Sequence, residues 1–326
     1  MCTASCGGWG SPHIRTSSGY SQEHLEEFWD EMVRELAIEW FEPYTQVLDV
    51  SRGVEWARWF TGGKLNIAWN CLDRHANGTA RDRLAVIWEG EDSSIRTLTF
   101  GELRRETDRL ANALRALDLA PGDRVALYMP MVPEVVMILY ACFKLGLVAV
   151  PIFSGFGYGA TAVRLQDSGA RVLFTSDFLE RRGRRSRCSR KPMRRWPRAV
   201  PSSGSSSGAT RAATSRGIDV WWHDFVAGQP EQCAALPLDS EAPGLLLYTS
   251  GTTGRPKGAV HTHAGAPAQT AKEIYLTFDR QPDDRFWRVS DIGWMMGPWE
   301  IIGNSAERSC CTKARPTTPR RSASGK

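Results

Sequence analysis

The sequence predicts an α/β fold in which a parallel sheet is flanked by helices. Between residues 82 and 176, short apolar segments of strand length alternate with amphipathic segments of helix length. A further apolar strand, expected over 244–249, runs directly into a glycine-rich loop. The chain has 326 residues, of which 42% are hydrophobic and 24% are charged, so it is long enough to bury a substantial core.

The first expected element is an amphipathic helix that begins at Ser21 and ends before Pro43. Its apolar residues recur at spacings of three and four, which is the period of a helix with one buried face. These residues are Leu25, Phe28, Trp29, Met32, Val33, Leu36 and Trp40. The tryptophan-rich stretch that follows, through Cys71, is expected to pack irregularly against a larger body.

The alternating region begins with a predicted hairpin, followed by a helix that a capping box at Thr99 and Glu102 opens. Pro133 is expected to start a second helix and Gly146 to end it. The remaining expected strands are 124–129, 147–152 and 171–175, with a helix around 161–166. Beyond the glycine-rich loop we expect a helix over 265–276, a strand over 286–289, and a loop with a short helical start over 291–303.

The periodic pattern stops between residues 178 and 217. Twelve of the 41 Lys and Arg residues lie in this segment with a single acid, so the net charge of +5 has a local origin. A disordered basic loop, a nucleic-acid or membrane patch, and the product of out-of-frame translation are three open interpretations. Because the basic run 180–216 has one aromatic residue, Trp196, and no recognisable module, we do not expect nucleic-acid binding.

The segment that follows the strand at 244–249 has the composition of a phosphate-binding loop. Glycine permits a close backbone approach, and hydroxyls and backbone amides donate hydrogen bonds to phosphate oxygens. Lys257 adds a positive charge suited to the outer phosphates. It is not a Walker A loop, because Pro256 precedes Lys257 and Gly258 follows it. The expected binding residues are Thr249, Ser250, Gly251, Thr252, Thr253, Gly254, Lys257 and Gly258.

The run Tyr248-Thr-Ser-Gly-Thr-Thr-Gly-Arg-Pro-Lys-Gly258 resembles the signature of the AMP-forming, adenylate-forming superfamily. This superfamily includes acyl-CoA synthetases, luciferases and the adenylation domains of peptide synthetases. Other stretches resemble its acetyl-CoA synthetase-like branch, and the resemblance covers about 20–177 and 218–303. These stretches are Trp59-Phe-Thr-Gly-Gly-Lys-Leu-Asn66, Asn70-Cys-Leu-Asp-Arg-His75, Ile87-Trp-Glu-Gly90, Leu98-Thr-Phe-Gly-Glu-Leu103 and Asp291-Ile-Gly-Trp294.

The resemblance implies that a carboxylate and ATP form an acyl-adenylate and pyrophosphate, after which the acyl group passes to CoA. It implies that the loop hydroxyls and Lys257 hold the β- and γ-phosphates of ATP, with Mg²⁺ shared by the nucleotide. His261, His263 and Trp294 become candidates for the substrate pocket, with a packing role as the alternative for each. Arg164 becomes a candidate contact for CoA, with a surface arginine as the alternative.

The resemblance also implies adenine, ribose and catalytic-lysine motifs that have no counterpart after Gly303. We therefore assign no catalytic residue and expect impaired adenylation in this chain. A non-catalytic nucleotide-binding fragment, or half of a split enzyme with a complementary C-terminal half, is the alternative. The expected domains are an extension over 1–77, a partial and incomplete N-terminal AMP-binding domain over 78–306 that the basic segment 178–217 interrupts, and a disordered tail over 307–326.

Composition excludes several other classes of protein. No apolar run reaches eighteen residues, and the first residues lack the features of a signal peptide. No CxxC pair meets a second pair or a histidine cluster, so no metal site is expected. These features predict a cytoplasmic protein. The resemblance to the acetyl-CoA synthetase-like branch implies a small carboxylate, ATP and CoA as its partners.

Overall fold

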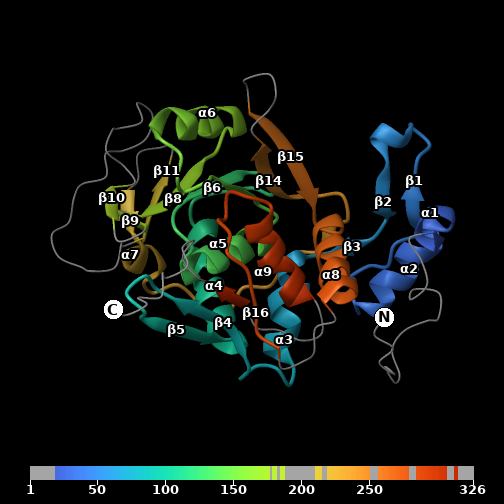
Figure 1. The fold of residues 1–326 in the computed structure, drawn as a ribbon, viewed down its shortest axis with the longest axis horizontal. Coiled ribbons are helices and arrows are strands. Elements are labelled where there is room, and N and C mark those ends of the chain that lie inside the picture. The colour runs from blue at the N-terminus through green and yellow to red at the C-terminus, as the bar shows by residue number, and fades with distance from the viewer. Residues whose placement is uncertain are drawn as a thin grey trace, which may run out of the picture.

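The computed structural model describes residues 19–176, 178–181, 184–187, 210–214, 219–249, 256–278, 284–306 and 312–314. Its centre is a seven-stranded sheet with helices on both faces, which confirms the predicted α/β class (Figure 1). The strands are β6 (Arg124–Tyr128), β7 (Val148–Pro151), β8 (Val172–Ser176), β11 (Thr210–Thr214), β12 (Asp219–Trp221), β14 (Pro243–Thr249) and β15 (Lys257–Thr262). Their order across the sheet is β12-β11-β8-β6-β7-β14-β15.

The middle of this sheet is parallel, as the sequence predicts. Strand β6 pairs in parallel with β7 and β8, and β14 pairs in parallel with β7. The outer strands differ from the prediction, since β11 is antiparallel to β8 and β15 is antiparallel to β14. The reversal at β15 arises because the glycine-rich loop turns the chain straight back along β14, without a crossover helix.

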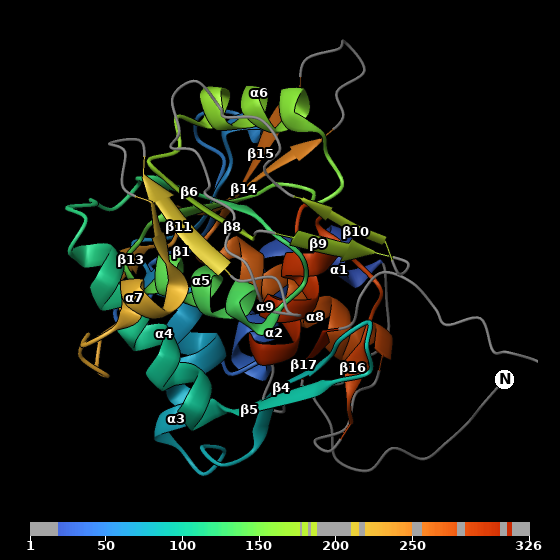
Figure 2. The same ribbon diagram turned by 90° about the vertical axis from the view of Figure 1, so that its left-hand side faces the viewer.

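The two faces of the sheet carry unequal layers of helices. Helix α6 (Tyr158–Ser168) lies alone above one face in Figures 1 and 2 and packs on a small apolar cluster that includes Tyr128, Leu165 and Tyr248. The other face supports the main core. The helices of that side are α4 (Phe100–Arg115), α5 (Pro133–Lys144), α7 (Trp222–Val226), α8 (Gly265–Phe278) and α9 (Met296–Ala306). Helix α5 is buried along nearly its whole length, which explains its continuous apolar run.

The predicted start and stop signals of α4 and α5 are confirmed. The Thr99 side chain accepts a hydrogen bond from the Glu102 N–H, and the Glu102 carboxylate accepts one from the Thr99 N–H, which completes the capping box. Pro133 occupies the first turn of α5, and Gly146 after it has a φ of +66°. This left-handed conformation is accessible to glycine at little cost.

We expect Thr99→Ala to lower the free energy of unfolding by about 1 kcal/mol, because the first turn of α4 loses its side-chain cap. Urea unfolding checks this value, with the exposed Thr79→Ala as the matched control. An equal effect of the two substitutions would show that the cap does not stabilise the helix.

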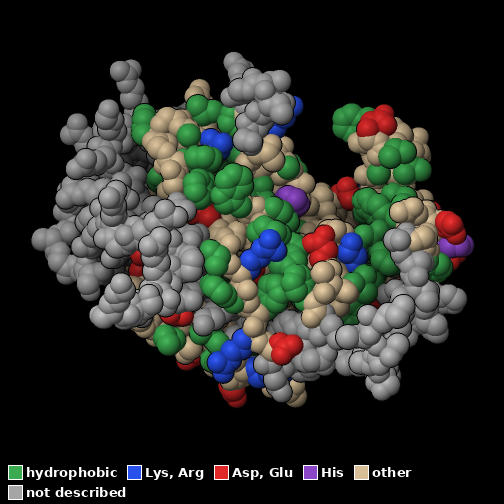
Figure 3. Space-filling view, viewed as in Figure 1, with side chains coloured by type: hydrophobic (Ala, Val, Ile, Leu, Met, Phe, Trp, Pro, Cys, Tyr) green, Lys and Arg blue, Asp and Glu red, His purple; other side chains and the backbone are tan. Residues whose placement is uncertain are grey.

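The N-terminal part of the chain forms a separate set of short elements against the main body. A two-stranded arm, built from β1 and β2, projects from the body, and a notch separates it from the rest of this face in Figure 3. The elements are α1 (Tyr20–Glu23), α2 (Leu25–Glu35), β1 (Gln46–Asp49), the 3₁₀ turn η1 (Val54–Trp56), β2 (Arg58–Thr61), β3 (Lys64–Leu65), the π-helical turn η2 (Trp69–Asp73) and α3 (Arg74–Asn77).

The first helix is shorter and more broken than the sequence predicts. After α1, helix α2 ends at Glu35, and the predicted continuation toward Pro43 is wrong. Ala37 takes a left-handed φ of +50°, and the Ile38 N–H donates to the Val33 carbonyl at 2.9 Å. This pattern is a helix-terminating turn that usually uses glycine, so the sequence offered no signal for it.

The remaining elements confirm the predicted hairpin and correct the prediction for residues 291–303. The predicted hairpin is present as β4 (Leu84–Glu89) and β5 (Ile95–Thr99). The expected loop after 291 is instead mostly helix α9. The further strands are β9 (Phe178–Arg181), β10 (Arg184–Arg187), β13 (Leu238–Asp239), β16 (Phe286–Trp287) and β17 (Thr312–Ala314). Strands β9, β10 and β11 lie inside the basic segment 178–217, and β17 lies inside 307–326, two regions where the sequence shows no periodic pattern.

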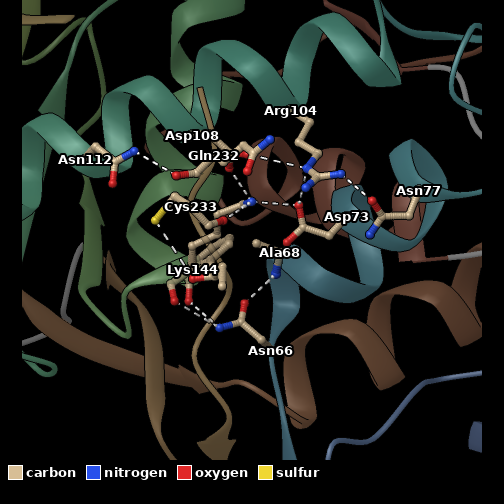
Figure 4. A network of polar contacts seen from close by, with 12 residues as sticks. Asn66, Ala68, Asp73, Asn77, Arg104, Asp108, Asn112, Lys144, Gln232 and Cys233 are labelled. Atoms are coloured by element: carbon tan, nitrogen blue, oxygen red, sulfur yellow. Dashed lines mark hydrogen bonds and ion pairs between the residues drawn. The ribbon is translucent and has the colours of Figure 1, made fainter. Parts of the chain in front are cut away.

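A buried network of charges joins the N-terminal elements to α4 and α5 (Figure 4). Lys144 is fully buried, and its Nζ contacts the carboxylates of Asp73 at 2.6 Å and of Asp108. It also donates to the Cys233 carbonyl at 3.0 Å. Arg104 approaches both carboxylates at 3.5 and 3.4 Å, so two cations face two anions.

Candidate functional site

The two ends of the predicted phosphate-binding loop lie side by side. Thr249 ends β14, Lys257 begins β15, and the two residues are direct partners in the antiparallel pair. The Thr249 hydroxyl donates to the Lys257 carbonyl at 3.4 Å, and both side chains are exposed. The strands therefore bring a hydroxyl and an ammonium group to the same end of the hairpin. The loop residues themselves, Ser250, Gly251, Thr252, Thr253 and Gly254, lie outside the described residues.

Gly258 has a packing reason to be glycine. It pairs with Tyr248, and a Cβ at this position would lie 2.8 Å from Leu246 Cδ1. That distance is below ordinary van der Waals contact, so a larger residue would push the hairpin strands or the Leu246 side chain aside. Because Leu246 Cδ1 is the end of a flexible side chain, a larger residue at position 258 would mainly require that side chain to move.

Arg164 is buried in α6, so the surface alternative for this residue is wrong. It is 6% exposed, and its guanidinium carbon lies 4.1 Å from the centre of the Phe156 ring and 5.8 Å from that of Tyr248. Its Nη1 donates to the Ala160 carbonyl at 2.8 Å. Its buried Nε has no hydrogen-bond partner within the part of the chain that the structure describes. Burial lowers the pKa of Arg164, which indicates a cation that a bound anion would stabilise.

The rings of Phe156, Phe153 and Trp294 contact one another in succession, and we call them the aromatic row. Arg164 lies over Phe156 at one end of this row, and Trp294 forms the other end. Its ring is 47% exposed and lies 5.6 Å from the ring of Phe153, which in turn contacts Phe156 edge-on at 5.2 Å. The same two segments, which carry Phe153 and Trp294, are also joined by hydrogen bonds. The buried Asp291 carboxylate accepts one from the Ser154 N–H at 3.3 Å and another from the Ser154 hydroxyl. The structure therefore joins two predicted site segments, although their residues are far apart in sequence.

The two candidate histidines have different surroundings. His261 is half-buried on β15 opposite Leu245, and burial lowers its pKa. His263 is fully buried and packs edge-on against Phe143, with ring centres 6.0 Å apart. Its Nδ1 accepts a hydrogen bond from the Ile67 N–H at 3.2 Å. This position favours the packing alternative for His263, whereas the place of His261 leaves both alternatives open.

Burial lowers the pKa of His263 to about 3, so protonation of this side chain opposes folding. A depressed pKa contributes stability above the unfolded value of about 6.5, and this stability is lost as the pH falls toward 3. Between pH 7 and 5 we expect the wild type to lose about 1–2 kcal/mol more than His263→Gln, which stays neutral. Urea unfolding at both pH values tests this, and identical losses would contradict it.

Asp167 is a site residue that the sequence did not reveal. Its carboxylate accepts a hydrogen bond of 2.6 Å from the Tyr248 hydroxyl, directly before the loop. The two residues are 81 positions apart, and no local pattern marks the contact. The sequence does show that Asp167 follows Arg164 by three residues, a spacing that makes the two side chains neighbours on one helix.

Metal and membrane features are absent from the residues that the structure describes. These residues contain no group of three His, Cys, Asp or Glu side chains that could hold a metal ion. None of the described helices is long and apolar enough to cross a membrane. Three cysteines within the described ranges, Cys71, Cys142 and Cys233, are buried and form no disulfide.

Two family models match the chain in succession. The model described as acetyl-coenzyme A synthetase N-terminus matches residues 16–71, and the model described as AMP-binding enzyme matches residues 72–324. The second match covers most of the chain, including both ends of the loop and the aromatic row.

Several relatives are similar over most of this chain. It is 39% identical over 294 residues to the acetyl-coenzyme A synthetase of Methanothrix soehngenii, which is 86% of this chain and 42% of that protein. It is 40% identical over 289 residues to the acetyl-coenzyme A synthetase of Mycobacterium tuberculosis (strain ATCC 25618 / H37Rv), 85% of this chain and 43% of that one. The solved acetoacetyl-CoA synthetase from Streptomyces lividans matches with a TM-score of 0.77 and 28% identity, over 91% of this chain and 46% of that chain. The chain thus spans less than half the length of each.

Proposed function

We propose that this chain, which belongs to the AMP-binding enzyme family, holds the phosphates of ATP in the activation of a short-chain carboxylate by an AMP-forming acyl-CoA synthetase. One observation carries the proposal. Strands β14 and β15 pair Thr249 with Lys257 at the two ends of a loop rich in glycine and hydroxyl groups. An open hairpin end with a cation and several donors suits a polyanion.

In the proposed reaction, a carboxylate oxygen attacks the α-phosphorus of ATP, and the bond to the pyrophosphate oxygen breaks. Negative charge then grows on the leaving pyrophosphate, where Lys257 and the loop hydroxyls can neutralise it. The pairing of β14 with β15 would keep Thr249 and Lys257 in place before the reaction, which lowers the cost of orienting these two groups. Mg²⁺ would arrive with the nucleotide phosphates and neutralise part of their charge. Among the described residues no cluster is available to hold the ion by itself.

The second proposed step transfers the acyl group from the adenylate to the thiol of CoA, with release of AMP. Arg164 is the proposed contact for a CoA phosphate, since its buried Nε has no partner in the described part of the chain. Trp294, with His261 as a second candidate, would line the acyl side. The proposed use of ATP and CoA also supports the cytoplasmic location expected from the sequence.

A second candidate function follows from the coverage of the relatives. Because the chain spans 42% to 46% of three of them, we propose as the alternative that it binds ATP without turning it over unless the rest of the family's length is supplied. Each missing electrostatic contact to the transition state costs about 10²- to 10³-fold in rate. The chain would then act as one half of a split enzyme or as a nucleotide-binding protein.

Acetate-dependent exchange between ATP and pyrophosphate tests both functions. We expect the purified chain to bind MgATP and to exchange at least about 10²-fold more slowly than the full-length Methanothrix soehngenii relative. Addition of the part of that relative that this chain does not align with should raise the exchange rate if the chain is half of an enzyme. An unchanged rate would favour nucleotide binding alone, and failure to bind MgATP would refute the proposed function.

A further inference from the structure

Helix α6 holds the residue that directly precedes the proposed phosphate-binding loop. The Tyr248 hydroxyl donates to Asp167 Oδ2 at 2.6 Å, and the Arg164 guanidinium lies over the Tyr248 ring at 5.8 Å. The ring is 7% exposed and belongs to the apolar cluster beneath α6. Burial, followed by the hydrogen bond to Asp167, raises the pKa of Tyr248, so the hydroxyl remains a donor at neutral pH.

The same tyrosine is also the strand partner of Gly258, at the other end of the loop. Tyr248 pairs with Gly258 across the hairpin, and a Cβ on Gly258 would lie 3.6 Å from Tyr248 Cε1. Thr249 and Lys257 are the next pair toward the loop. A movement of the Tyr248 ring would therefore be transmitted to both residues that enter the loop.

We infer that Asp167 is a positioning residue for the phosphate-binding loop, because its hydrogen bond to Tyr248 fixes the hairpin pair from which the loop leaves the sheet. Asp167 is exposed, so it accepts the hydrogen bond without a burial cost. Arg164 lies one turn earlier on α6, and the helix thus connects the proposed CoA contact with the base of the ATP loop. The inference rests on the proposed function of that loop.

Four single substitutions separate the hydrogen bond from other effects. Asp167→Ala and Tyr248→Phe each remove it from one side. Asp167→Asn keeps an oxygen acceptor but removes the charge, and Gln166→Ala is the matched control at the exposed neighbouring position. If Asp167 and Tyr248 act through one bond, the double variant Asp167→Ala/Tyr248→Phe should resemble each single variant.

Amide hydrogen exchange of peptides that cover 249–258 gives a local measurement that needs no ligand. We expect Asp167→Ala and Tyr248→Phe to raise exchange there about two- to tenfold, the range of one hydrogen bond. Peptides of α5 should exchange as in the wild type, which distinguishes positioning from general destabilisation. Asp167→Asn and Gln166→Ala should stay near the wild type. Unchanged loop exchange in the first two variants, or equal exchange in Asp167→Asn and Asp167→Ala, would overturn the inference.

Titration with MgATP separates this inference from the proposed function. The dissociation constant should rise by a similar factor in Asp167→Ala and Tyr248→Phe, with little change in Asp167→Asn. A wild-type chain that binds no MgATP would count against the proposed function, and the exchange measurement would still decide the role of Asp167. A wild type that binds, with both variants binding equally well, would overturn the positioning role.

Discussion

Replacement of Lys144 by methionine should lower the free energy of unfolding by about 3–5 kcal/mol. Lys144 is fully buried between the carboxylates of Asp73 and Asp108, and its loss leaves two buried anions with Arg104 as their remaining cation. Burial already raises the pKa of Asp73 despite the neighbouring lysine, which indicates how costly an unpaired carboxylate would be here. Urea unfolding at pH 7 measures the loss.

A second substitution shows whether charge or packing causes this loss. Lys144→Met/Asp108→Asn restores one cation opposite one anion and should recover a large part of the stability. Lys64→Met is the matched control, because Lys64 forms an exposed ion pair with Glu42 at 2.9 Å and such pairs contribute little. A loss below about 1 kcal/mol for Lys144→Met would show that the network is not a main connection between the N-terminal elements and the sheet domain.

Gly293→Ala should lower the free energy of unfolding by about 3 kcal/mol, at the upper end of overpacking effects. A Cβ at this position would lie 2.0 Å from the Phe153 backbone nitrogen and 2.3 Å from its Cα. These neighbours are backbone atoms, so they cannot rotate away as a side chain could. The substitution would separate the segment that carries Trp294 from the segment that carries Phe153 and Phe156.

Gly159→Ala is the matched control for this prediction. Gly159 lies within α6, and a Cβ there meets no atom within 4 Å. Alanine favours a helix over glycine by about 1 kcal/mol, so this variant should be as stable as the wild type or more so. Thermal unfolding of both variants checks the pair, and equal midpoints would contradict the close approach at Gly293.

Much of the fold follows from local signals in the sequence. The capping box at Thr99 and the proline at 133 each determine a helix start through contacts within four residues. The apolar strand before Thr249 likewise predicts where the loop leaves the sheet. These signals are local in sequence, so a single chain displays them without knowledge of its tertiary contacts.

Other features depend on distant residues and could not be predicted. The turn after helix α2 places Ala37 in a left-handed conformation, where sequence patterns lead one to expect glycine. Strand β11 has no apolar pattern, yet it pairs with β8 in the central sheet. Lys144 could have been noticed as a lone charge in an apolar helix, but its partners at 73 and 108 come from other elements.

The candidate site also combines features that local sequence predicts with features that depend on distant residues. The loop and its two ends could be recognised from one continuous run of residues, and the hairpin pairs Thr249 with Lys257. The aromatic row, with Arg164 at one end, joins segments whose contact no spacing reveals. The family resemblance made His263 a candidate pocket residue with packing as the alternative, and its ring packs in the core.

Equilibrium titration of the purified chain with MgATP, beside its Lys257→Ala variant, tests the proposed phosphate site most directly. The wild type should bind, and the variant should bind about ten- to a hundredfold more weakly, the range of a hydrogen bond to a charged group. Lys64→Ala should bind as the wild type does, because this lysine pairs with Glu42. Equal binding by the wild type and Lys257→Ala would contradict a phosphate site at the end of the β14–β15 hairpin.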